Sequence, residues 1–114
     1  EHHKRSYTNI TDIVKACELV VKNIDATIGE IFNIGSDKTV STGDGIKTIE
    51  RIIGKPAKFI VVPRRHGDQA ETAAQIEKAR RVLGYSPTIS LEEGLARQVA
   101  WYMDKIHGRL GGDK

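Results

Sequence analysis

The chain has 114 residues, 39% of them hydrophobic, and its 18 Lys and Arg residues against 15 Asp and Glu residues give a formal net charge of +3. A domain typically takes about 100–200 residues, so we expect residues 1–114 to form a single domain with one small core and no second domain. The basic residues are scattered instead of clustered with aromatic residues, which argues against a nucleic-acid-binding protein.

Nothing in the sequence predicts a membrane-bound or secreted protein. The longest apolar runs, such as residues 59–62, are far shorter than the roughly 20 residues that span a bilayer. Residues 1–4 do not resemble a secretory signal. The single cysteine, Cys17, lies in an apolar pattern where we expect it to be buried, and one cysteine excludes an internal disulfide framework. These features predict a cytoplasmic protein in a reducing setting.

The first part of the chain predicts one helix and two short strands. Apolar residues recur at three- and four-residue spacing over about 12–22, which predicts a helix that Thr11 or Asp12 caps. Residues 30–34 form a β-rich run closed by a Gly-Ser-Asp turn signal, which predicts a buried strand. Residues 39–40 are expected to add a brief second strand.

A second helix is predicted to follow, capped by Ser41 or Thr42. Gly54 stands where a helix ends, with Pro56 just beyond it. Two glycines in the first turn each cost about 1 kcal/mol relative to Ala, so we expect the start to fray or to shift to Asp44. The apolar face of this helix consists of Ile46, Ile49, Ile52 and Ile53.

Residues 58–62, the clearest strand of the sequence, lead into a polar loop at 64–68. Loops held between ordered elements often carry functional residues, so this loop is the best candidate for a site. Arg64 and Arg65 offer planar guanidinium groups to a bidentate anion such as a phosphate or pyrophosphate, and Asp68 can accept hydrogen bonds from sugar hydroxyls. A plain solvated turn is the alternative interpretation.

The remaining residues that could carry chemistry predict no metal site and no catalytic site. Arg5 offers a second phosphate contact, or is a surface arginine without a ligand. His2 and His3 lack the ligand spacing of a metal site, and no nucleophile or orienting carboxylate is predicted beside His66. We therefore assign no metal-binding residue and no catalytic residue.

The last third of the chain predicts two helices. The first covers about 74–83 and ends before a glycine. Ser90 and Glu93 form a capping box at the start of the second, which is expected to cover 91–107. The glycine-containing residues 108–114 are expected to form a flexible tail. The predicted inward-facing residues of the last helix are Leu95, Val99, Tyr102 and either Met103 or Ile106.

Motifs spread along nearly the whole chain match one pattern in order and spacing. An Arg-Ser-Tyr strand runs into a helix at 5–16, and a Phe-Asn-Ile-Gly turn lies at 32–35. The closing set of motifs consists of 63–68, Thr72, 78–79, 83–87, 91–95 and Trp101. Together these motifs resemble the extended short-chain dehydrogenase/reductase family, the NAD-dependent nucleotide-sugar epimerases and dehydratases.

The resemblance implies roles for four residues. Arg5 and Arg65 match the two arginines that bind the nucleotide pyrophosphate in the family, and Asp68 matches the acid that binds the ribose. Thr72 falls where the family lines its sugar pocket, and a small side chain there implies space for an N-acetyl group. The implied ligand is a nucleotide-sugar such as a UDP-sugar.

The sequence also departs from the family. Ser6 and Gln75 stand where the family prefers Asp, so local capping or hydrogen bonding is expected to differ at these positions. The sequence has neither the Gly-x-x-Gly-x-x-Gly turn that binds NAD nor the catalytic Tyr-x-x-x-Lys pair. The resemblance therefore implies an α/β fragment with a small sheet and about four helices, the substrate-binding C-terminal portion without the Rossmann half. It implies NAD for the complete enzyme and no cofactor in this chain.

Two hypotheses follow from these observations. The leading one is the nucleotide-sugar-binding segment of an NAD-dependent epimerase or dehydratase, which has no turnover alone. The alternative is a free-standing or degenerate binding module that self-associates. Separation from the Rossmann half is expected to expose apolar surface and an unpaired sheet edge, which a homo-oligomer would cover.

Overall fold

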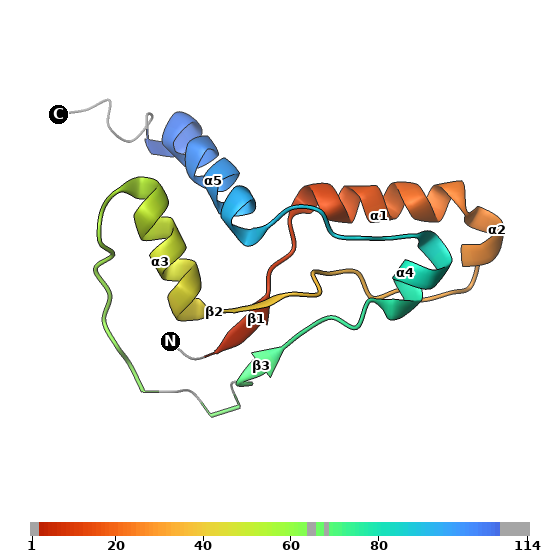
Figure 1. The fold of residues 1–114 in the computed structure, drawn as a ribbon, viewed down its shortest axis with the longest axis horizontal. Coiled ribbons are helices and arrows are strands. Elements are labelled where there is room, and N and C mark those ends of the chain that lie inside the picture. Colours follow the sequence, from red (N-terminus) through yellow and green to blue (C-terminus); the bar gives the residue numbers. More distant parts are fainter. Residues whose placement is uncertain (1–2, 64–65, 68, 108–114) are drawn as a thin grey trace.

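The computed structural model describes residues 3–63, 66–67 and 69–107. The molecule is elongated, with extents of 57 × 37 × 21 Å, and its helices form two groups at opposite ends (Figure 1). One group consists of α1 (Ile10–Lys22), α2 (Ile24–Thr27) and α4 (Glu77–Leu83), and the other of α3 (Thr42–Ile53) and α5 (Leu91–Tyr102). The expected mixed α/β class is confirmed, with five α-helices in the described residues where we expected about four.

Three short strands form a sheet whose central strand is β1 (Lys4–Ser6). β2 (Thr39–Ser41) pairs with β1 antiparallel, and β3 (Glu71–Thr72) pairs with it parallel. In this register Arg5 lies opposite Val40 on one side and opposite Thr72 on the other. The short strand predicted at 39–40 is therefore confirmed.

The core lies at the end of the molecule that holds α1 and α4. α1 begins after Asn9, whose side chain accepts a hydrogen bond from the Thr11 amide at 2.9 Å, so the cap predicted at Thr11 or Asp12 is wrong. Asp12 is instead buried, with 1% of its surface exposed. The buried apolar residues that form the core are Ala16, Ile76, Ala79, Leu83 and Tyr85.

Cys17 is exposed, and the prediction that it is buried is wrong. At 100° per residue, the helix places Cys17 with Ile10, Val14 and Val21 within an arc of about 60° that faces away from Ala16. Ile10, Val14 and Val21 are 50–71% exposed. α1 thus carries two apolar stripes, and only the one containing Ala16 is covered by the described residues.

α3 follows β2 directly. The Ser41 hydroxyl accepts a hydrogen bond from the Asp44 amide at 3.0 Å, and Gly54 closes the helix at a φ of 74°. The predicted shift of the start to Asp44 is wrong, because the helix begins at Thr42. The Thr42 amide donates to the His3 carbonyl at 2.9 Å, which joins the first turn of α3 to the residue before β1. This turn is helical although it contains two glycines.

The strands predicted at 30–34 and 58–62 are both wrong, because neither segment is a strand in the structure. Phe32 and Ile34 pack against the core, but Ile31 is 83% exposed. A strand needs a neighbour for its N–H and C=O groups, and the described residues place no strand beside either segment. The apolar composition of these segments is consistent with sheet formation, but composition alone does not make a strand without a neighbour.

The helices of the last third start or end at different residues than predicted. α4 begins at Glu77 instead of 74, and Ile76 at its N-cap makes no side-chain capping hydrogen bond. Gln75 immediately precedes this position, so the departure from the family at 75 coincides with an uncapped helix start. α5 ends at Tyr102 and continues as a π-helical turn, η1 (Met103–His107).

The predicted cap of α5 is half confirmed. The Ser90 hydroxyl accepts a hydrogen bond from the Glu93 amide at 3.2 Å, whereas the Glu93 carboxylate accepts from Arg97 at 2.6 Å. Tyr102 is exposed, so its predicted inward packing is wrong. Of the alternatives Met103 and Ile106, Met103 is exposed and Ile106 is half-buried. The predicted tail at 108–114 lies outside the described residues.

Candidate functional site

The candidate site is built around Arg5 in the central strand. One terminal nitrogen of its guanidinium donates to the Lys4 carbonyl at 2.8 Å, and the other donates to the Gln69 carbonyl at 2.9 Å. The second of these hydrogen bonds joins β1 to the chain just after the predicted phosphate loop. The side chain is half-buried, so the guanidinium is held in one place while part of it stays open to solvent.

Thr72 is the second predicted site residue in the described part of the chain. Because Thr72 and Arg5 are direct partners in the β1–β3 pair, their side chains project from the same face of the sheet. Val40 lies on that face too, as the partner of Arg5 in β2. On the other face, the Thr39 hydroxyl donates to the Glu71 carboxylate at 3.2 Å. The register therefore brings Arg5 and Thr72 together.

The predicted residues Arg65 and Asp68 lie outside the described residues, and their roles stay predictions. Gln69, whose carbonyl anchors Arg5, immediately follows Asp68 in the sequence. Sequence patterns give no signal for Gln69, because a backbone carbonyl acts here independently of the side-chain type. Its contact with Arg5 requires the fold.

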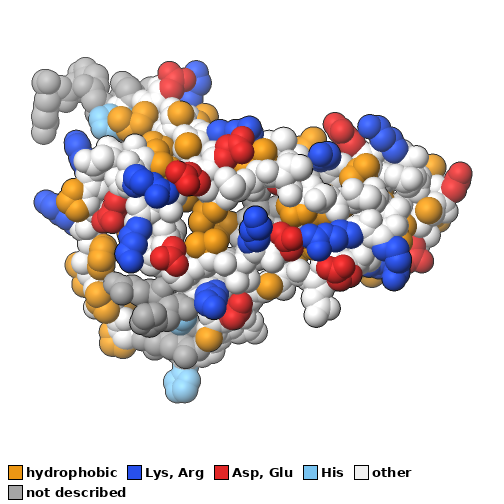
Figure 2. All heavy atoms as spheres, in the orientation of Figure 1, with side chains coloured by type: hydrophobic (Ala, Val, Ile, Leu, Met, Phe, Trp, Pro, Cys, Tyr) orange, Lys and Arg blue, Asp and Glu red, His pale blue; other side chains and the backbone are white. Residues whose placement is uncertain are grey.

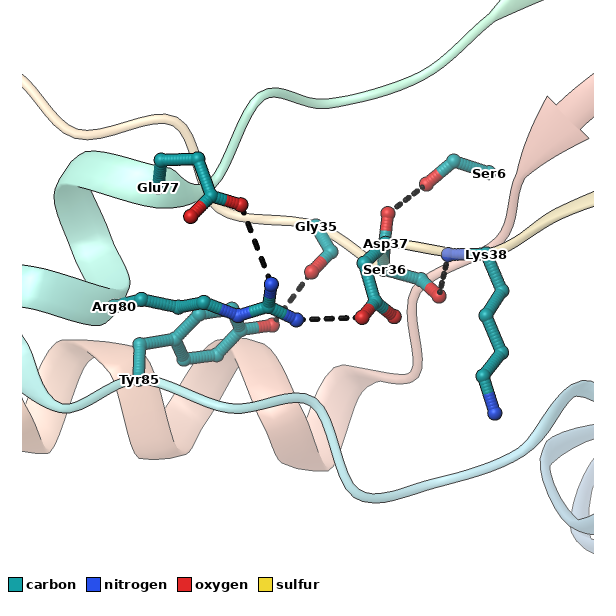
Figure 3. A network of polar contacts seen from close by, with 8 residues as sticks. All are labelled: Ser6, Gly35, Ser36, Asp37, Lys38, Glu77, Arg80 and Tyr85. Carbon is teal, nitrogen blue, oxygen red and sulfur yellow. Dashed lines mark hydrogen bonds and ion pairs between the residues drawn. The ribbon is translucent and has the colours of Figure 1, made fainter.

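Behind the site, a network of polar contacts holds β1 to the turn at 35–38 (Figure 3). The Ser6 hydroxyl donates to the Ser36 carbonyl at 2.8 Å, and the Ser36 amide donates to the Thr8 hydroxyl at 3.1 Å. The Ser36 hydroxyl in turn accepts from the Lys38 amide at 3.1 Å. Ser6, which departs from the family, thus has a role of its own in joining β1 to this turn.

The same turn is held from α4. Arg80 pairs with Asp37 and with Glu77. The hydrogen bond from Arg80 holds the pKa of the Asp37 carboxyl below its usual value. The buried Tyr85 hydroxyl donates to the Gly35 carbonyl at 3.0 Å. Burial, together with the charges of Asp12 and Asp37, raises the pKa of Tyr85, so this phenol is a hydrogen-bond donor and not an acid at neutral pH.

Two other classes of site find no support in the part of the chain that the structure describes. No three His, Cys, Asp or Glu side chains among residues 3–63, 66–67 and 69–107 lie close enough together to hold a metal ion. None of the helices described there has the length and apolar character needed to cross a bilayer.

Comparison with known proteins gives consistent matches along the chain. No family-level sequence model matches it. The chain is 37% identical over 103 residues to the UDP-glucuronate 4-epimerase of Thermodesulfobacterium geofontis, which covers 90% of this chain and 31% of the relative. It is 33% identical over 116 residues to UDP-glucuronate 4-epimerase 4 of Arabidopsis thaliana, covering 91% of this chain and 26% of the relative.

Solved structures give the same result. The crystal structure of UDP-glucuronic acid 4-epimerase from Bacillus cereus, in complex with UDP-glucuronic acid and NAD, matches with a TM-score of 0.83 and 32% identity. The match covers 90% of this chain and 33% of that chain. This chain thus spans about a third or less of the proteins that it matches, in their C-terminal part. Order of motifs, sequence identity and fold agree, and the chain is homologous to the C-terminal part of the NAD-dependent nucleotide-sugar epimerases.

Proposed function

We propose that this chain is the nucleotide-sugar-binding portion of an NAD-dependent epimerase or dehydratase. In this proposal Arg5 and Arg65 bind the diphosphate of a UDP-sugar, Asp68 binds the ribose, and Thr72 lines the sugar pocket. The observation that carries the proposal is the placement of Arg5 and Thr72 on one face of the sheet, with the Arg5 guanidinium hydrogen-bonded to Gln69 next to the loop of Arg65.

The geometry of Arg5 suits a diphosphate. A guanidinium has five N–H donors, and the hydrogen bonds to Lys4 and Gln69 occupy two of them. Within the described residues the remaining donors make no other hydrogen bond, so we propose that they bind an anion, and the two carbonyl contacts fix the plane of the group in advance. A planar, oriented guanidinium is the side chain that binds phosphate oxygens in pairs.

In our proposal NAD binds outside this chain, whose sequence lacks a Gly-x-x-Gly-x-x-Gly turn. The pyrophosphate of a dinucleotide binds a glycine-rich turn between a strand and a helix N-terminus. Here β1 and α1 are joined by Tyr7, Thr8 and Asn9, without a glycine. In our proposal NAD therefore belongs to the remaining part of an epimerase-like enzyme, and we assign this chain no step of hydride transfer.

Titration with UDP, followed by NMR or calorimetry, tests the proposal. We expect binding with a millimolar or lower dissociation constant that is lost in Arg65→Ala and in Arg5→Ala, because each substitution removes a guanidinium from the anion. Arg81→Ala removes the same charge from the exposed face of α4 and is the matched control. We also expect no interconversion of UDP-sugars when NAD is added. Absence of UDP binding by the unchanged chain would refute the proposal, and turnover would refute the assignment of catalysis to another part.

A second proposal concerns self-association, which the exposed apolar surface favours. Ile24 and Ile28, which follow α1 in the chain, are also exposed, at 52% and 71%. Residues 59–62 are 58–90% exposed, and Figure 2 shows hydrophobic side chains along the edge where Figure 1 places the segment between α3 and β3. Such surfaces on a small protein mark contacts with another chain.

Light scattering across a concentration series tests this second proposal. We expect the apparent mass to rise with protein concentration. Val21→Lys, which places a charge in the centre of the exposed stripe, should return the protein toward a monomer. Lys22→Gln changes the neighbouring exposed residue and leaves the side chains of the apolar stripe unchanged, so it serves as the control. A monomer mass that stays constant up to high protein concentration would contradict the proposal.

A further inference from the structure

Asp12 is a buried carboxylate that the proposed site does not use. It lies in the first turn of α1, and only 1% of its surface is exposed. One of its oxygens accepts hydrogen bonds from the Thr88 amide at 3.0 Å and the Thr88 hydroxyl at 2.9 Å, and the other accepts from the Ile89 amide at 3.1 Å. These donors are 76 and 77 residues away in sequence and immediately precede Ser90, the cap of α5.

The two elements that Asp12 joins have little apolar contact at this point. A hollow of about 470 Å³ lies between residues 7–11 and the first turns of α5. At Gly94 the two sides lie near each other, because an added Cβ there would lie 3.2 Å from the Asn9 side-chain nitrogen. Because packing does not fill the space between α1 and α5, the three hydrogen bonds of Asp12 are the main direct tie between them.

This tie closes a ring of elements that contains the candidate site. β1 leads through residues 7–9 into α1, and Asp12 joins α1 to the start of α5. α5 packs against α3, where Arg51 pairs with Glu92 at 3.1 Å. α3 follows directly from β2, which pairs with β1 at Arg5.

We infer that Asp12 is a positioning residue that fixes α5 against the start of α1 and thereby keeps β1, which carries Arg5, in its place in this ring. The neutral acid or an amide cannot replace the carboxylate, because two backbone amides and a hydroxyl all point donors at it. The titratable groups around it are Lys15 on α1, which is charged, and Tyr85 in the connection before α5, whose phenol is neutral. The inference extends the proposed function to a residue outside the ligand contacts.

Amide hydrogen exchange on the whole chain tests the inference without any ligand. In Asp12→Asn we expect exchange at Thr88, Ile89 and the first turns of α5 to accelerate about tenfold or more, with a smaller acceleration at the β1–β2 pair. Exchange in α4 and the second half of α1 should stay slow. Thr88→Val removes only the hydroxyl donor and should give a smaller change at the same amides. Asp25→Asn, an exposed carboxyl of α2, is the matched control.

A titration gives a second, spectroscopic readout. The amide resonances of Thr88 and Ile89 should shift together at acidic pH as Asp12 takes up a proton, and neither shift should remain in Asp12→Asn. Unchanged exchange at these amides in Asp12→Asn would overturn the inference. So would an equal acceleration throughout α1 and α4, which would make Asp12 a general core residue; if Asp12→Asn does not fold, Thr88→Val decides by the same criteria.

UDP affinity separates this inference from the function on which its last step rests. If the unchanged chain binds UDP, Asp12→Asn should weaken binding severalfold although it touches no proposed ligand contact. Loosening of α5 without any loss of UDP affinity would refute the positioning of the site. If the unchanged chain binds no UDP, the proposed function fails, and the exchange measurement still decides whether Asp12 holds α5 and β1 together.

Discussion

At the scale of single residues, backbone groups do as much as side chains to build the candidate site. Arg5 is oriented by two carbonyls, and Asp12 accepts from two backbone amides. The Tyr85 hydroxyl likewise donates to the carbonyl of Gly35, so the turn behind β1 depends on atoms that every residue type shares. The sequence motifs predict Arg5 and Thr72 as site residues, whereas the two carbonyls that orient Arg5 could not be predicted from them.

Gly35 shows how closely this turn is packed. A Cβ added at Gly35 would lie 2.6 Å from the Cβ of Ala74, which has no flexible end that could move aside. Gly35→Ala should therefore lower the free energy of unfolding by about 1–3 kcal/mol, the usual cost of overpacking. Gly45→Ala is the matched control, because Gly45 is a buried position in α3 where an added Cβ meets nothing within 4 Å. The control should raise the free energy of unfolding by up to about 1 kcal/mol through helix propensity.

Urea unfolding followed by circular dichroism measures both free energies. The two substitutions add the same methyl group, so opposite signs isolate the effect of local space. Equal changes in the two variants would show that the turn at Gly35 relaxes and is not a fixed support of β1.

At the scale of elements, local signals predicted the helices better than the strands. Ser41 and Ser90 cap the starts of α3 and α5, and Gly54 caps the end of α3, as expected. A cap depends on residues within one turn of it. The segments at 30–34 and 58–62 have strand-like composition, but a strand is completed by a distant partner. The chain spans only about a third of the length of its relatives, and the described residues hold no partner strand for either segment.

The same contrast explains α1. Its apolar periodicity predicted a helix over 12–22, and the helix is there. Periodicity cannot say which of two apolar stripes the rest of the fold covers, so it predicts a buried Cys17, whereas Cys17 lies on the exposed stripe. Asp12, read as a cap, lies within the helix and faces the start of α5 because long-range packing brings Thr88 to it.

At the scale of the whole molecule, Asp12 joins the end that holds α1 to the start of α5, and its protonation makes this contact sensitive to acid. Burial raises the pKa of Asp12, but hydrogen bonds from Thr88 and Ile89 and the charge of Lys15 outweigh burial, so its pKa lies below the usual value. In the unfolded chain the same carboxyl titrates near its ordinary value of about 3.9. The unfolded state therefore binds the proton first as the pH falls.

The sign of the pH dependence follows from this difference. Asp12 contributes its full stabilisation above about pH 4, and the contribution is lost as the pH falls through the lower pKa of the folded state. We expect the free energy of unfolding to decrease as the pH falls below about 4, and Asp12→Asn to be less stable at neutral pH with a flatter decrease. Asp37, whose pKa Arg80 lowers at the surface, should contribute less and lose its contribution in salt, because exposed ion pairs are screened. Urea unfolding at a series of pH values, with and without 0.5 M salt, measures these contributions, and an equal acid slope in Asp12→Asn and the unchanged chain would show that the buried carboxylate does not join the two ends of the molecule.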